Sequence, residues 1–282
     1  MNRATPPPRH EVRLILERAL AEDFALAGDL TSNALVPADH TSRGHVVARA
    51  EGTIAGLEIG LEVFDLVEGS VAVDRKVSDG DRVVAGQILA TLAGSSRAIL
   101  SGERTCLNLL GHLSGVATST ASVVDLVSGF DTRVADTRKT TPGLRSLEKY
   151  AVRCGGGTNH RFGLHDAVMI KDNHVAVAGS VSAAVAAARN SIGHTVSITV
   201  EVDRLDQIEA AVHGGADVVL IDNLRGDDLR RAVEMVDGRA LTEASGGITP
   251  ATAADVAATG VDIISLGWIT HSAPRLDVAL DV

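Results

Sequence analysis

The sequence predicts an α/β fold in two parts, a mixed α/β domain over residues 1–115 and a βα barrel over residues 116–269. Three observations lead to this prediction. Short apolar segments separated by glycine turns fill residues 44–100, whereas strand-like and alanine-rich helical segments alternate from residue 132 onward. The alternating part also lacks the glycine fingerprint of dinucleotide-binding folds. Strands that alternate with helices form a parallel sheet, and without that fingerprint a barrel is favoured over a doubly wound sheet.

Composition excludes several classes of protein. The 282 residues are 45% apolar, which is enough for a substantial core. Aromatic residues make up only 2% and the net charge is −10, and both values argue against nucleic-acid binding. Two cysteines are too few for a disulfide framework or a thiolate metal cage. Because the polar start has no signal-peptide core and no long apolar run follows, we expect a cytoplasmic protein without a membrane partner.

The first domain is predicted to combine helices with antiparallel strands. Residues 10–23 have the apolar spacing of a helix, and residues 102–122 are typical of another. Between them, residues 44–56 and 76–94 are typical of short strands joined by tight turns. The second of these segments resembles the hairpins of lipoyl-type carrier domains. Its turn, Asp79-Gly80-Asp81, has no lysine to modify, so we interpret it as structural.

The barrel domain is predicted from six strand-like segments and the helical segments between several of them. The strands are expected at residues 132–135, 167–170, 196–200, 218–221, 240–242 and 263–266. The helices are expected at residues 180–190, 205–213, 227–236 and 250–259.

A concentration of positive charge lies between Arg138 and His174. Seven basic residues face three acids there, a local excess of four positive charges in an acidic chain. The basic residues are Arg138, Lys139, Arg145, Lys149, Arg153, Arg161 and Lys171. Such a cluster concentrates the electrostatic field where an anionic ligand docks. We therefore interpret it as a binding site for a small polyanion and not as a solvated helix face.

Polar residues follow all six predicted barrel strands, each at the same end. They are Asp136 and Arg138, Lys171, Glu201 and Asp203, Asp222, Glu243 and Ser245, and Gly267. Barrel enzymes build their active sites at the carboxyl ends of their strands. The pattern predicts an active site at this end of the barrel.

Two glycine turns end the last two predicted strands. Ser245-Gly246-Gly247-Ile248 and Leu266-Gly267-Trp268 could let backbone amides approach a phosphate, although turns that enter helices have the same composition. Glu201 and Asp222 could share Mg²⁺ with substrate phosphate oxygens, or could pair with Lys139 or Lys171. The sequence leaves both alternatives open.

A glycine-rich loop, residues 155–161, is predicted to carry His160 and Arg161 to the site. His160 and His174 are favoured as ligand contacts because both belong to the basic cluster. No spacing typical of a zinc site occurs in the chain.

These motifs, in this order, resemble the quinolinate phosphoribosyltransferase family over nearly the whole chain. The matching segments are Glu103-Arg104-Thr105, Asn108-Leu109, residues 136–140, Pro142-Gly143-Leu144-Arg145, Lys149, Gly155-Gly156-Gly157, Asn159-His160-Arg161, residues 170–174, Glu201-Val202, Asp222-Asn223, residues 243–248 and Thr270-His271-Ser272. The resemblance implies a type II phosphoribosyltransferase-like fold, with an open barrel of about seven strands and a tail, residues 270–282, that joins the N-terminal domain. The seventh strand is then expected where the sequence pattern is unclear.

The family's reaction joins quinolinate to phosphoribosyl pyrophosphate and releases pyrophosphate and CO₂, which leaves nicotinate mononucleotide for NAD synthesis. The resemblance implies that Lys139, Lys171, Glu201 and Asp222 are catalytic, and that Glu201 and Asp222 also serve Mg²⁺ and the ribose hydroxyls. The implied contacts to the quinolinate carboxylates are Arg138, Lys139, His160 and Arg161, with Thr137 beside them and Arg104 supplied by the partner subunit of a homodimer. The 5′-phosphate is expected at Ser245, Gly246, Gly247 and Gly267, with His271 nearby.

Two alternatives and one departure from the family accompany this prediction. The related protein of molybdenum-transport operons shares the fold, but residues 170–174 favour the quinolinate enzyme. A non-catalytic sensor on the same barrel would need no complete ring of site residues. Trp268 stands where a small residue is expected, which leaves the shape of the phosphate turn open. Assembly beyond the dimer is also open.

Overall fold

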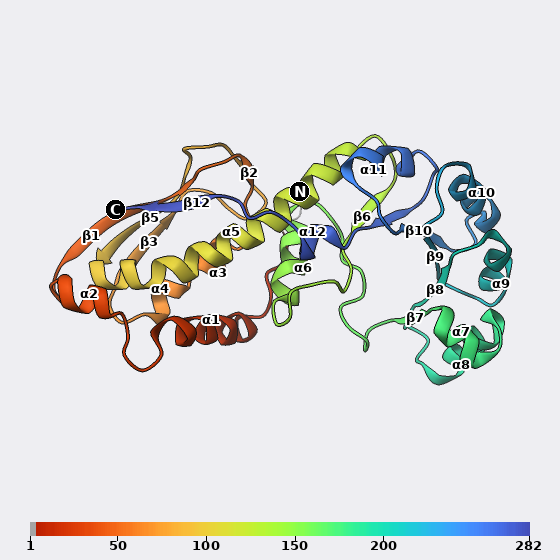
Figure 1. The fold of residues 1–282 in the computed structure, drawn as a ribbon, viewed down its shortest axis with the longest axis horizontal. Helices are drawn as coiled ribbons and strands as arrows, with labels where there is room; N and C mark the ends of the chain where they lie inside the picture. The colour runs from red at the N-terminus through yellow and green to blue at the C-terminus, as the bar shows by residue number, and fades with distance from the viewer. Residues whose placement is uncertain (1–3) are drawn as a thin grey trace. The chain divides into compact units, whose positions relative to one another are not determined.

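The computed structural model describes residues 4–282, which fold into two compact units. The first unit contains the chain up to Ala121, Thr140–Gly156 and Ile269–Val282. The second contains Ser122–Lys139 and Gly157–Trp268. Figure 1 shows the elements of both units along the chain.

An antiparallel sheet forms the centre of the first unit. Its strands are β1 (Thr41–Ala48), β3 (Val71–Arg75), β5 (Ile88–Ser95) and β12 (Val278–Asp281), in the order β12-β1-β5-β3. Two short strands, β2 (Gly52–Thr53) and β4 (Arg82–Val83), pair separately. The antiparallel strands expected between residues 44 and 94 are therefore present, and the C-terminal tail adds β12 to the edge of their sheet.

Six helices that belong wholly or mainly to the first unit lie within residues 9–154. They are α1 (Arg9–Phe24), α2 (Leu30–Leu35), α3 (Leu57–Leu61), α4 (Val63–Leu66), α5 (Ser96–Leu126) and α6 (Arg145–Cys154). The two expected helices correspond to α1 and α5, and α5 is longer than its apolar pattern indicates. Phe64, Leu92 and Leu110 are fully or almost fully buried in this unit.

Helix α6 groups with the first unit, although the sequence pattern includes residues 140–156 in the barrel domain. Two contacts fix it there. The Tyr150 hydroxyl donates to Asp79, with 2.7 Å between the oxygens, and His112 Nε2 lies 2.8 Å from a carboxylate oxygen of the fully buried Glu148. These side chains bind α6 to residues that precede the barrel.

A parallel sheet forms the second unit, and all six predicted strands are present. They are β6 (Arg133–Ala135), β7 (Val168–Ile170), β8 (Ile198–Val202), β9 (Val218–Asp222), β10 (Leu241–Ser245) and β11 (Ile263–Ser265). Their order is β6-β11-β10-β9-β8-β7. At the position of a seventh strand, Thr158 forms one isolated parallel bridge with Ala135 beside β6. The barrel is thus open.

Short helices follow the strands and lie along the outer side of this sheet (Figure 1). They are α7 (Asp172–Ala178), α8 (Val181–Ser191), η1 (Leu205–Gln207), α9 (Ile208–His213), α10 (Gly226–Val236) and α11 (Pro250–Ala257). A last short helix, α12 (Trp268–His271), follows β11 and belongs mainly to the first unit. Local sequence explains their starts: Ser180 caps α8, and Pro250 occupies the first turn of α11. Helix α10 buries Leu229, Ala232 and Val236 on one face. No helix in residues 4–282 has the length and apolar character needed to cross a bilayer.

Gly115 should be essential for packing in the first unit. A Cβ atom at this position of α5 would lie 2.1 Å from the carbonyl oxygen of Pro274. In a helix, alanine is more stable than glycine by roughly 0.5–1 kcal/mol. We nevertheless expect Gly115→Ala to lower the free energy of unfolding by about 1–3 kcal/mol, because the backbone of the C-terminal tail must move to make room for the added Cβ atom. Urea unfolding measures this change. Gly193→Ala is the control, since no heavy atom lies within 4 Å of its added Cβ. Equal stability of the two variants would contradict the close approach.

Candidate active site

A cavity of about 440 Å³ lies at the carboxyl ends of the strands of the second unit. It is lined by Thr137, Arg138, Lys139, His160, Arg161, Met169, Lys171, Glu201, Leu220, Asp222, Glu243, Ser245 and Ser265. Most of the predicted site residues of the barrel therefore surround one space. Met169 and Leu220 add apolar wall that the sequence pattern did not single out, because a strand hides the direction of such side chains.

The fully buried carboxylate of Asp136 holds two of the loops that carry these residues. Asp136 directly follows β6 and accepts hydrogen bonds from the His160 amide and the Asn159 side chain, both at 2.7 Å. On the β6 side, the Thr137 hydroxyl accepts the amide proton of Lys139 at 3.0 Å. Because Asp136 joins the end of β6 to the glycine-rich loop, it brings Arg138 and Lys139 to the same cavity as His160 and Arg161.

Two arginines bring positive charge close together in the cavity. Burial lowers the pKa of the Arg161 guanidinium, repulsion from Arg138 lowers it further, and Asp166 acts in the opposite direction. The Nε atom of Arg138 is buried and has no hydrogen-bond partner within residues 4–282. A buried donor without a partner is costly, so this pair of guanidinium groups favours an anionic ligand.

The basic cluster seen in the sequence is divided by the fold. Arg138, Lys139, Arg161 and Lys171 line the cavity, whereas the other three basic residues belong to α6 in the first unit. There Arg145 donates to the Thr140 hydroxyl and Arg153 donates to the carbonyl of Thr5. The cavity of the second unit is thus lined by four of the seven basic residues of the cluster.

Two carboxylates at the ends of neighbouring strands face the same cavity. Glu201 follows the middle of β8 and pairs with the Lys171 ammonium, while Asp222 ends β9 and accepts from the Asn223 side chain at 2.7 Å. No group of three or more potential metal ligands occurs among the described residues. This donor set fits Mg²⁺ only in the form in which one or two carboxylates assist the phosphate oxygens of a substrate.

Glu243 is a member of the site that sequence reasoning noted only as a strand-end residue. Its side chain is 3% exposed, one carboxylate oxygen lies 3.3 Å from His160 Nε2, and the other is buried without a hydrogen-bond partner. His160 Nδ1 accepts the amide proton of Arg161 at 2.6 Å, so the ring proton is on Nε2, toward Glu243. The sequence signal for this role is the acidic residue Glu243 within an otherwise uncharged strand, β10.

The turn after β10 depends on glycine at its second position. Gly246 has φ +90°, and a Cβ atom there would lie 2.2 Å from the side-chain oxygen of Asn223. Gly247 also has positive φ, and Ser245 lines the cavity. Gly267 is the second residue after β11. The backbone of this turn can therefore approach a ligand without side chains in between.

Three other predicted contacts are not among the residues that line this cavity. Arg104 and His271 belong to the first unit, where both are exposed and the His271 ring contacts the Ser272 hydroxyl at 2.6 Å. His174 accepts the Lys171 amide proton through Nδ1 at 2.9 Å. This bond caps the start of α7, and the expectation that His174 contacts a ligand stays a prediction.

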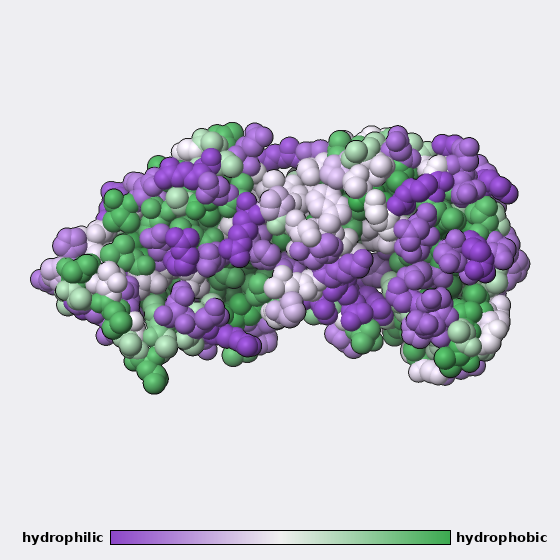
Figure 2. Space-filling view, in the orientation of Figure 1, coloured by the Kyte–Doolittle hydropathy of each residue, from purple (hydrophilic) through white to green (hydrophobic). Residues whose placement is uncertain are grey.

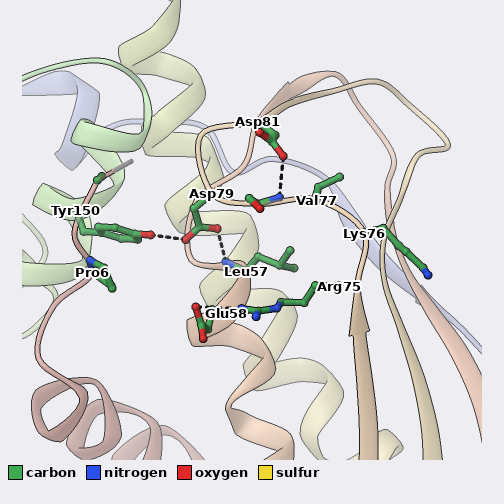
Figure 3. A pocket seen from close by; sticks show the side chains of 11 residues that line it. Pro6, Leu57, Glu58, Arg75, Lys76, Val77, Asp79, Asp81 and Tyr150 are labelled. Atoms are coloured by element: carbon green, nitrogen blue, oxygen red, sulfur yellow. Dashed lines mark hydrogen bonds and ion pairs between the residues drawn. The ribbon is translucent and has the colours of Figure 1, made fainter. Parts of the chain in front are cut away.

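A second cavity, of about 490 Å³, lies in the first unit (Figure 3). Its polar groups satisfy one another: Asp79 accepts from Tyr150 and from the amides of Gly56 and Leu57, and Arg75 pairs with Glu58 at 3.0 Å. The nearby Cys154 thiol has its pKa raised to about 12 by burial and by Asp79. This cavity has no uncompensated cations and no reactive thiolate at neutral pH, so the barrel cavity is the better candidate for an anion site.

Family models identify both parts of the chain. The model for the quinolinate phosphoribosyl transferase N-terminal domain matches residues 29–114, and that for the C-terminal domain of the same family matches residues 116–281.

Individual relatives agree with these matches over nearly the full length. The chain is 44% identical to the probable carboxylating nicotinate-nucleotide pyrophosphorylase of Bacillus subtilis, covering 96% of this chain and 93% of that protein. It is 45% identical to the carboxylating nicotinate-nucleotide pyrophosphorylase of Mycobacterium leprae, covering 95% of each. The crystal structure of NadC from Streptococcus pyogenes superimposes with a TM-score of 0.95 at 38% identity, over 99% of this chain and 98% of that one. The chain therefore belongs to the quinolinate phosphoribosyltransferase family.

Proposed function

We propose that this chain transfers the phosphoribosyl group of phosphoribosyl pyrophosphate to quinolinate with loss of CO₂, and so makes nicotinate mononucleotide for NAD synthesis. The observation that best supports this assignment is the pair Arg138 and Arg161. One has a buried Nε donor without a partner, and the other has a pKa lowered by burial and by its neighbour. A planar dianion with two adjacent carboxylates supplies partners for both guanidinium groups.

The quinolinate subsite is assigned to the loops that Asp136 holds together. Arg138, Arg161 and Lys139 provide charge, and Thr137 orients Lys139 through its hydrogen bond to the Lys139 amide. His160 and Glu243, whose Nε2 and carboxylate oxygen lie 3.3 Å apart, both line this part of the cavity. Met169 and Leu220 provide apolar wall for the pyridine ring.

The second substrate is assigned to the opposite strands of the cavity. Ser245, Gly246, Gly247 and Gly267 receive the 5′-phosphate, with His271 nearby, and Glu201 and Asp222 bind the ribose hydroxyls. Lys171, held by Glu201, lies between the two subsites and offers its ammonium to the charge shared by both substrates.

The chemistry follows from this placement of charges. The bond between the anomeric carbon and pyrophosphate breaks while the pyridine nitrogen bonds to that carbon, so the ribose becomes oxocarbenium-like and the ring becomes a pyridinium cation. Glu201 and Asp222 stabilise positive charge on the ribose, and Lys139 and Lys171 stabilise negative charge on the departing pyrophosphate. The carboxylate next to the ring nitrogen then leaves as CO₂. Its electron pair stays on the ring carbon beside the cationic nitrogen and is protonated. No covalent enzyme intermediate is needed.

Mg²⁺ is assigned to the same cavity. Bound Mg²⁺ neutralises charge on the leaving pyrophosphate. Glu201 and Asp222 would hold it together with phosphate oxygens, in keeping with a donor set of two carboxylates. We assign the enzyme to the cytoplasm, where quinolinate and phosphoribosyl pyrophosphate would meet.

A homodimer is proposed to complete the site. Arg104 is exposed on α5, and its Nη2 lies 3.8 Å from a carboxylate oxygen of Glu103. The first unit also exposes apolar side chains on α1, α2 and the loop between them, including Leu14, Leu26, Leu30 and Leu35. Figure 2 shows hydrophobic surface in this region. Exposed apolar side chains and an exposed arginine on the same unit are what an isologous interface needs to place Arg104 over the barrel of a second copy.

The defining test is incubation with quinolinate, phosphoribosyl pyrophosphate and Mg²⁺, followed by detection of nicotinate mononucleotide. Nicotinate in place of quinolinate should react at least about 10⁴-fold less efficiently in kcat/KM, because it leaves cations of the pocket unpaired. Similar turnover of the two acids would contradict the assignment of Arg138 and Arg161. Ligand binding without any product would favour a phosphoribosyl-ligand sensor on the same fold.

Removal of divalent metal should abolish turnover. Treatment with a chelator is expected to stop product formation, and added Mg²⁺ should restore it, since the donor set relies on metal-bound pyrophosphate. The Asp222→Asn variant should need a higher Mg²⁺ concentration for half-maximal rate. Full activity in metal-free buffer would refute the metal assignment.

Mixed dimers test the shared site. Loss of a buried contact between arginine and a carboxylate costs roughly 2–5 kcal/mol, so Arg104→Ala and Lys139→Ala should each be nearly inactive. In a heterodimer with one change per subunit, both defects fall in one site and the other site is intact. Random exchange between the two variants should therefore recover about a quarter of wild-type activity. If verified subunit exchange restores nothing, Arg104 acts within its own subunit or has no role.

A further inference from the structure

Two side chains outside the assigned site residues hold the glycine turn after β10. Arg225, which immediately precedes α10, donates through Nη2 to the carbonyl of Gly246 and through Nη1 to the carbonyl of Leu224 at 3.2 Å. Trp268, the first residue of α12, donates its indole N–H to the carbonyl of Ile248 at 3.1 Å. The family resemblance assigns a function to neither residue.

These contacts fix which way the turn presents its amides. The Asn223 amide bonds the Ser245 carbonyl at 3.0 Å, and Arg225 bonds the next carbonyl, that of Gly246. No peptide bond between described residues is cis, so each carbonyl points away from the N–H of its own peptide. The amides of Gly246 and Gly247 are thus directed away from Asn223 and Arg225, respectively. A turn with two such fixed amides is preorganised for an anion.

Arg225 also adds charge beside the turn. A Cβ atom at Gly247 would lie 3.5 Å from Arg225 Nη2, so the guanidinium runs along this glycine. The acid nearest along the helix, Asp227, pairs with Arg230 at 3.2 Å. Within residues 4–282, Arg225 has no carboxylate partner, and its positive charge remains available at the turn.

Trp268 links the two glycine turns that end the last strands. It follows Gly267 directly and reaches Ile248, the residue after Gly247. Its half-buried ring is not among the residues that line the cavity, so a large residue is accommodated without blocking the site. Because Trp268 stands where a small residue is expected, its indole N–H can form this hydrogen bond, which connects the two turns.

We propose that Arg225 and Trp268 are positioning residues for the 5′-phosphate of phosphoribosyl pyrophosphate. They hold Ser245–Gly247 in the conformation that receives the phosphate, and Arg225 adds electrostatic attraction. This inference rests on the proposed function, because that function places the 5′-phosphate at this turn. The proposal predicts that substitution of Arg225 or Trp268 changes KM for phosphoribosyl pyrophosphate but not KM for quinolinate.

The test compares KM values for the two substrates in Trp268→Phe, Arg225→Gln and Arg225→Lys. Trp268→Phe keeps an aromatic ring and removes the N–H, and we expect KM for phosphoribosyl pyrophosphate to rise about three- to tenfold. Arg225→Gln should raise it about tenfold and weaken its dependence on salt, and Arg225→Lys should recover part of the loss. KM for quinolinate should stay within about twofold. Arg230→Gln is the matched control, since Arg230 lies on the same helix in an exposed pair and should change neither value.

Calorimetric binding of ribose 5-phosphate separates this proposal from the function on which it rests. If the wild-type protein forms no nicotinate mononucleotide, the proposed function fails, and weaker ribose 5-phosphate binding by Trp268→Phe and Arg225→Gln would still support the positioning role. If the wild-type protein is active, the positioning role is overturned when both KM values rise alike. Unchanged values in both variants would overturn it as well.

Discussion

The buried carboxylate of Asp136 is the interaction on which the site depends. It directly follows β6, is fully buried and accepts two hydrogen bonds at 2.7 Å from the loop that carries His160. The isolated bridge between Ala135 and Thr158 lies beside it, so backbone and side chain act together on the same loop. A buried carboxylate needs such partners, because an unpaired charge in the interior is strongly unfavourable. The same hydrogen bonds therefore stabilise this part of the barrel and position the cations of the cavity.

The charges in the cavity are only partly balanced by the protein. Lys171 has Glu201 as its partner, whereas Arg138 keeps an unpartnered buried donor and repels Arg161. Folding therefore holds two like charges close together in a partly desolvated space. Binding of a dianion relieves this repulsion, so part of the affinity for substrate arises from the arrangement of the empty pocket.

The barrel could be predicted from sequence because strand-like and helix-like segments alternate regularly along the chain. The six predicted strands are short segments, largely apolar, with polar residues at one end, and this pattern also located most of the cavity residues. The helices α3 and α4 were missed because residues 57–66 lie between strand-like segments and are too short for a clear helical period. The grouping of α6 with the first unit could not be predicted, since it depends on long-range contacts from Tyr150 and Glu148. The capping bond of His174 could not be predicted, because a capping histidine and a ligand-binding histidine look the same in a sequence.

The open seam of the barrel has a consequence for how the protein behaves in a crowded solution. On one side of the seam the sheet ends in β7, which has three residues, and on the other side it ends in the single bridge at Thr158. Unpaired strand edges can recruit strands of other chains, and proteins limit this hazard by keeping such edges short and flanking them with charged residues. Lys171 and Asp172 directly follow β7. An edge this brief offers little backbone to another chain, so the barrel can remain open without serving as a template for aggregation.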